Sequence, residues 1–184
     1  DQPCFLRHVA LHGLAERLQL GDGGLGGAAG RLDGGGLQTQ AGHLVRGLLP
    51  AGNYALQNDA LAIDGAVFAG SRGWTVVPEN STNAQELKIY RRELMRLEFS
   101  LQSAQKLSQG RPIVAMLHFP PFGDRKEGSG FTELLEKYGV NTCVYGHLHG
   151  EGLRTAFNGE KNGVKYACTS CDGLGFRLLE LTEV

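Results

Sequence analysis

The chain has 184 residues, of which 41% are hydrophobic and 20% charged, and its formal net charge is -1. This length suffices for one domain with a hydrophobic core, and the composition is that of a globular protein rather than a disordered one. The near-neutral charge gives no electrostatic reason to expect a nucleic acid or an anionic membrane as the main partner, and no apolar run is long enough to span a bilayer.

Residues 1–50 differ in amino-acid composition from the rest of the chain. They include the low-complexity run 21–30 and the triplet Gly34–Gly36, and they carry many of the 28 glycines. Residues 9–18 have leucines at helical spacing, but the remainder is too rich in glycine to offset the entropy lost on ordering. We predict that residues 1–50 form a disordered or non-native segment and that residues 51–184 form the folded portion.

A β-hairpin is predicted next. Asp64-Gly65 lies between the apolar runs 61–63 and 66–69, and an Asp-Gly step between such runs is a strong turn signal. The loop that follows carries Arg72 and the only tryptophan, Trp74. These two side chains are candidates for binding substrate. The alternative is a surface arginine and a tryptophan packed on the edge of the core.

A long amphipathic helix is predicted from Asn83 onward. Residues 83–86 have the form of a capping box, and apolar side chains then recur at steps of three and four, which places them on one helix face. This stripe comprises Leu87, Tyr90, Leu94, Leu97, Leu101, Ala104 and Leu107. Arg91, Arg92 and Arg96 lie off the stripe, and we interpret them as a solvated face rather than a phosphate site.

Two predicted strands each lead into histidine. The apolar run 112–117 ends at His118, and residues 141–145 lead into His147 and His149. A helical segment separates the two runs, and the order strand, helix, strand implies parallel strands whose histidines share one rim of the sheet. An extended His-x-His backbone would point both rings to the same side, and neutral imidazole is a good ligand for zinc, iron and related ions.

The remaining elements are predicted from local patterns. The helix between the two histidine strands is expected over residues 129–139, because Ser129 is a plausible cap and Gly139 a good stop. Three further strands are expected over residues 152–157, 164–170 and 176–181.

The ordered set of motifs resembles the C-terminal half of the calcineurin-like metallophosphoesterases. The resemblance covers about residues 50–184. It rests on Leu56–Asp59, Gly70–Trp74, Leu117–Phe122, Phe131–Leu135 and Val144–Gly150. It implies an α/β fold with a pair of β-sheets, a β-sandwich, flanked by helices, here incomplete at its N-terminus.

The resemblance also implies an activity and a site. The protein would be a metal-dependent phosphoesterase that hydrolyses a phosphate mono- or diester with metal-activated water. His118 and His147 would ligate one divalent ion and His149 a second. The family's ions are Mn, Fe, Zn or Mg, and the partner is a phosphate-ester substrate.

Residues 1–50 do not carry the family's N-terminal motifs Asp-x-His, Gly-Asp and Gly-Asn-His-Asp in order. In the family these motifs supply the bridging carboxylate, the remaining ligands and the general acid. We therefore expect impaired metal binding and activity. We hypothesise that residues 1–50 stand in place of the natural metal-binding half.

Two alternatives stay open, an inactive fragment and a structural zinc module. Cys168 and Cys171 have the spacing of a zinc half-site, which His147, His149 or Cys143 could complete.

With only four cysteines, unevenly spaced, the chain does not match a secreted scaffold held by disulfides. We therefore expect a cytoplasmic protein.

Overall fold

The computed structural model describes residues 48–50, 54–56, 58–78 and 80–181. The chain divides into two units, residues 1–55 and 56–184, and the second contains all the elements described below. The prediction for residues 1–50 lies almost wholly outside the described residues, as does Cys4. None of the described helices combines the length and the apolar character that crossing a membrane requires.

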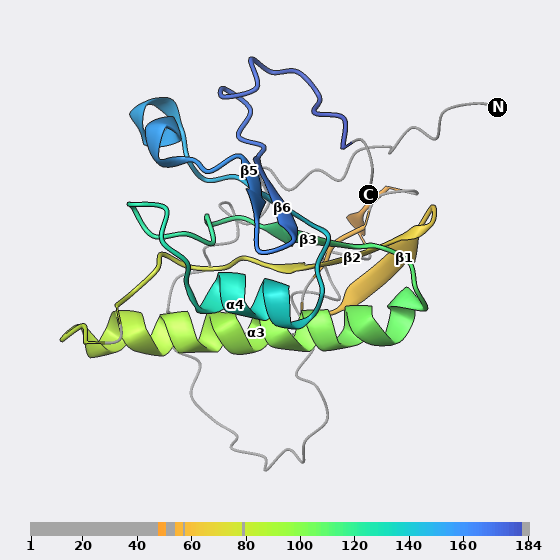
Figure 1. The fold of residues 1–184 in the computed structure, drawn as a ribbon, viewed down its shortest axis with the longest axis horizontal. Coiled ribbons are helices and arrows are strands. Elements are labelled where there is room, and N and C mark those ends of the chain that lie inside the picture. Colours follow the sequence, from red (N-terminus) through yellow and green to blue (C-terminus); the bar gives the residue numbers. More distant parts are fainter. Residues whose placement is uncertain (1–47, 51–53, 57, 79, 182–184) are drawn as a thin grey trace, which may run out of the picture. The chain divides into compact units, whose positions relative to one another are not determined.

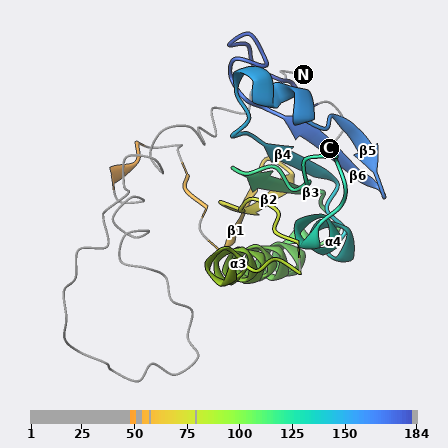
Figure 2. The same cartoon turned by 90° about the vertical axis from the view of Figure 1, so that its left-hand side faces the viewer.

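The second unit is an α/β fold built on one mixed six-stranded sheet, with strand order β1-β2-β3-β4-β6-β5. The parallel strands are β2 (Ala66–Ser71), β3 (Ile113–Leu117), β4 (Thr142–Tyr145) and β6 (Val164–Cys168). β1 (Ala60–Ile63) and β5 (Gly159–Lys161) pair antiparallel at the two edges. Figures 1 and 2 show helices α3 (Ala84–Ser108) and α4 (Gly130–Lys137) on one face of the sheet.

The hairpin and the parallel pair of histidine strands are confirmed. Asp64 and Gly65 both have positive φ, 46° and 88°, as a type I′ turn between β1 and β2 requires. β3 and β4 lie side by side and parallel, with α4 between them in the chain. The strand ends that carry the histidines therefore lie at one edge of the sheet.

The core lies between the sheet and the two helices. Leu97, Leu101 and Ala104 of α3 are fully buried, as the stripe predicted, and Leu135 of α4 joins them. Leu107, at the end of the predicted stripe, is 39% exposed. The helix also buries two polar residues, Ser100 and Glu93.

Ser100 bonds α3 to the sheet. Its hydroxyl accepts a hydrogen bond from the Gly70 N–H at 2.8 Å and donates to the Asp59 carbonyl. Gly70 also has to be glycine, because a Cβ there would lie 2.1 Å from the Met116 carbonyl oxygen of β3. At Gly70, the backbone of β2 therefore hydrogen-bonds α3 and lies against the backbone of β3.

Glu93 carries the only carboxylate among the buried side chains of the described residues. Its Oε1 accepts from Arg96 at 2.7 Å and from Arg72 and Arg92, each at 3.4 Å. Arg91 and Arg92 are exposed, as the interpretation of a solvated face predicts, and Arg92 and the partly exposed Arg96 also reach back to this carboxylate. The three guanidinium groups offset part of the cost of burying this charge, while Oε2 is buried with no hydrogen-bond partner.

Two of the predicted C-terminal strands are wrong. Residues 150–155 form a short 3-10 helix, η1 (Gly150–Thr155), where a strand was expected over 152–157. Residues 176–181 form no strand, and Phe176 and Leu178 are left 81% and 82% exposed. The strand expected over 164–170 ends at Cys168.

Tyr145→Phe is expected to lower the free energy of unfolding by about 2–4 kcal/mol, because it leaves two backbone groups of Phe157 without their hydrogen-bond partner. The Tyr145 hydroxyl donates to the Phe157 carbonyl and accepts from the Phe157 N–H, both at 2.7 Å, and the residue is 1% exposed. Urea unfolding measures the change. Tyr138→Phe is the control, since its hydroxyl bonds Glu98 near the surface, and a loss no larger than the control's would contradict the expectation.

Candidate metal centre

His118 and His147 meet at the carboxyl ends of β3 and β4. The His118 N–H donates to the Arg72 carbonyl at 3.1 Å, and the Gly146 N–H donates to the His118 carbonyl at 3.2 Å. These bonds continue the parallel pairing of β2, β3 and β4 beyond the strand ends. As a result, His147 Nδ1 lies 3.1 Å from His118 Nε2.

This separation fits two imidazoles that share an ion. With metal–nitrogen bonds of about 2.0–2.1 Å, two ring nitrogens on one ion lie about 3.0–3.4 Å apart. Without an ion, the same spacing lets one ring N–H donate to the other ring nitrogen. His118 and His147 therefore have the separation that an ion would need, and neutral imidazole suits Fe and Zn.

His147 adopts a backbone conformation that few residues other than glycine adopt. Its φ is +70°, and the Leu148 N–H donates to the Gly146 carbonyl at 2.8 Å, closing a tight three-residue turn around it. The prediction of an extended His-x-His segment is therefore wrong. Such a conformation costs about 1–3 kcal/mol and is concentrated at functional sites.

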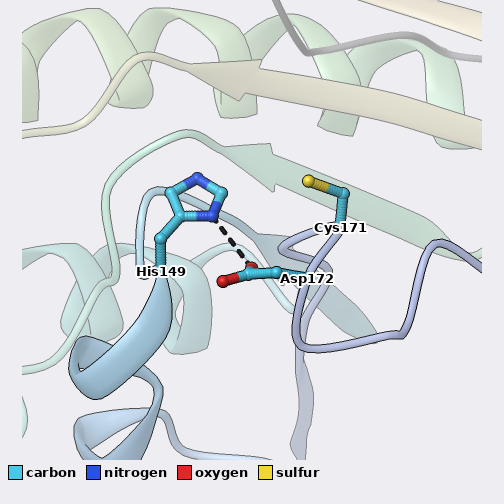
Figure 3. Close-up of side chains that lie close together, drawn as sticks. All are labelled: His149, Cys171 and Asp172. Atoms are coloured by element: carbon cyan, nitrogen blue, oxygen red, sulfur yellow. Dashed lines mark hydrogen bonds and ion pairs between the residues drawn. The ribbon is translucent and has the colours of Figure 1, made fainter.

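His149 lies in a second cluster, with two residues that follow β6. Figure 3 shows His149, Cys171 and Asp172 together, and one ligand atom of each lies within 4.8 Å of the others. His149 Nδ1 and Asp172 Oδ1 are 2.9 Å apart. Among the described residues, no other group of three or more potential ligand side chains has its ligand atoms within 4.8 Å of one another. The three histidines therefore do not form one compact group.

Backbone hydrogen bonds and His149 hold the Asp172 carboxylate in place. Oδ2 accepts from the Gly150 N–H at 2.8 Å, and Oδ1 accepts from the Gly173 N–H at 2.9 Å. The Gly150 N–H, then His149, hold the pKa of Asp172 below its ordinary value. Asp172 is therefore a fixed anion beside His149.

Arg72 and Trp74 lie next to the histidine pair. The Arg72 guanidinium is 4.4 Å from the centroid of the Trp74 ring, Trp74 packs on Phe119 at 5.2 Å, and Phe119 packs on His147 at 4.1 Å. Arg72 and Trp74 both hydrogen-bond to α3 as well: Arg72 donates to Glu93, and Trp74 Nε1 donates to Glu86 at 2.6 Å. The Arg72 side chain is still 41% exposed, which leaves part of its cationic surface accessible.

Of the two cysteines with zinc half-site spacing, Cys171 lies in the cluster with His149 and Asp172, and Cys168 does not. The Cys168 sulfur is buried and lies 3.6 Å from the Ser170 hydroxyl, outside the cluster that contains Cys171. Cys143 is fully buried, and burial raises the pKa of its thiol. Asp172 was missed as a site residue, because only the fold places the chain after β6 beside the chain after β4.

The fold and the site together define an α/β protein with histidines gathered at the carboxyl edge of a parallel sheet. Such edges are where open α/β sheets bind their ligands. Comparison of the chain with protein-family models, with curated proteins and with solved structures finds no significant match.

Proposed function

We propose that the protein is a metal-dependent phosphoesterase and that residues 56–181 are the C-terminal part of a metallophosphoesterase-type fold. The observation that carries this proposal is the 3.1 Å separation of His118 Nε2 and His147 Nδ1 at the ends of adjacent parallel strands. His118 and His147 would hold one divalent ion, and His149 a second.

The chain's own residues have distinct parts in the proposed reaction. When bound, the metal supplies an acidic water and positive charge opposite the phosphate. Arg72 would pair with the phosphate, because its guanidinium is partly exposed and lies over Trp74. Phe119 packs on both Trp74 and His147 and so fixes the distance between the two parts of the site.

Hydrolysis of nitrophenyl phosphates tests the proposal. The full chain is stripped with a chelator, and release of nitrophenol from p-nitrophenyl phosphate and from bis-p-nitrophenyl phosphate is followed with and without added Mn, Fe, Zn or Mg. We expect slow hydrolysis only with metal, since residues 1–50 carry none of the family's N-terminal motifs in order. If neither ester is hydrolysed with any of these ions, the chain is an inactive fragment and the proposal fails.

A further inference from the structure

We propose that His149, Cys171 and Asp172 form a site for a thiophilic divalent ion, such as zinc, that is separate from the His118–His147 pair. This goes beyond the proposed function, which names no donor besides His149 for a second ion. It shares His149 with that proposal but does not depend on hydrolysis, because ion binding is measured directly.

The sheet places the three donors together. β4 and β6 are parallel neighbours, with Tyr145 opposite Cys168 at their carboxyl ends. His149 follows β4 after a short turn, and Cys171 and Asp172 follow β6 in the same way. Figure 3 shows the Cys171 sulfur pointing toward the His149 ring, with Asp172 beside both.

The separations are close to those of ligands for one ion. Zinc binds sulfur at about 2.3 Å and nitrogen or oxygen at about 2.0–2.2 Å, so its donors lie at most about 4.5 Å apart. Here the donor atoms lie within 4.8 Å of one another, and His149 Nδ1 is 2.9 Å from Asp172 Oδ1. A small rotation of the Cys171 or His149 side chain would bring all three onto one ion.

The local backbone holds the donors before any ion binds. The Phe176 N–H donates to the Cys171 carbonyl at 2.7 Å, and the Gly175 N–H donates to the Asp172 carbonyl at 3.0 Å. The Gly150 N–H fixes the Asp172 carboxylate against the segment that carries His149. The His149 and Asp172 side chains are 49% and 33% exposed, so an ion reaches them from solvent.

The donor types select the class of ion. A thiolate, an imidazole and a carboxylate suit zinc and cobalt, whereas magnesium and calcium prefer oxygen alone. Three protein donors leave the fourth tetrahedral position to water, which is the coordination pattern of catalytic rather than structural zinc sites. On binding, the Cys171 thiol releases its proton to solvent, and the proton that His149 Nδ1 donates to the Asp172 carboxylate leaves Nδ1, so that a neutral ring carries its proton on Nε2.

Cobalt(II) titration tests the site, because a cysteine thiolate bound to cobalt gives a charge-transfer absorption band in the near ultraviolet. Cys4→Ser in the full chain removes the cysteine that lies outside the described residues. We expect this band to appear and to saturate as cobalt is added. We expect Cys171→Ser to abolish it, and Asp172→Asn to keep it while weakening binding by at least about tenfold.

Controls separate this site from the histidine pair. Asp124→Asn removes an exposed carboxylate elsewhere, and His147→Asn removes a ring of the other pair, so both should leave the band unchanged. Alkylation of Cys171 in the folded protein provides a second route to the same loss if Cys171→Ser fails to fold. A cobalt-saturated protein without the band, or a band that survives loss of the Cys171 thiol, would overturn the inference.

Discussion

Replacing His147 with asparagine is expected to reduce metal-dependent phosphoesterase activity by at least about 100-fold, because loss of a ligand should exceed the 10–100-fold effect of a residue that only supports one. His147 Nδ1 lies 3.1 Å from His118 Nε2, so removing this ring leaves His118 without the nitrogen that would share its ion. Asparagine is preferred to alanine because His147 has φ +70°, a conformation that asparagine tolerates well. The turn is thereby kept while the imidazole is removed.

Two readouts check this result. Isothermal titration with Mn²⁺ measures ion binding, and nitrophenyl phosphate hydrolysis measures activity, so binding is tested even if turnover is slow. Lys126→Asn is the matched control, because Lys126 also has positive φ, 63°, and lies in an exposed turn. If His147→Asn binds Mn²⁺ as tightly as the control does, the histidine pair is not the metal centre.

Leu101→Ala is expected to lower the free energy of unfolding by about 3–5 kcal/mol, at the upper end for a fully buried leucine, since the cavity it leaves cannot collapse easily. Leu101 is 0% exposed and belongs to the cluster in which α3 packs on the sheet. Ser100, its neighbour, hydrogen-bonds the backbone of β2 and so restricts movement of the helix into the cavity. Chemical denaturation followed by circular dichroism gives the change.

The matched control for this substitution lies on the same helix. Leu107→Ala makes the same chemical change at a side chain that is 39% exposed, and we expect it to cost less than about 1.5 kcal/mol. Equal losses for the two variants would mean that α3 does not pack on the sheet through Leu101.

Local patterns were sufficient to predict the elements that lead to the site. The Asn83 side chain accepts from the Glu86 N–H and begins α3, and Ser129 and Thr132 form a complete capping box at α4. The Glu86 carboxylate does not return to the cap as the predicted box would require, because it accepts from Trp74 Nε1 instead. The local capping signal therefore determines where α3 begins, whereas a tertiary contact determines that Glu86 accepts its hydrogen bond from Trp74.

The sequence by itself determined that α3 is a long helix, that β3 and β4 are parallel, and that His118 and His147 follow their carboxyl ends. Periodicity, caps and turn residues act within a few positions of the chain, so the sequence displays them directly. Tertiary structure alone decided that Glu93 is buried among arginines and that His147 lies in a strained turn. It also placed Asp172 and Cys171 beside His149, because that neighbourhood depends on which strands pair.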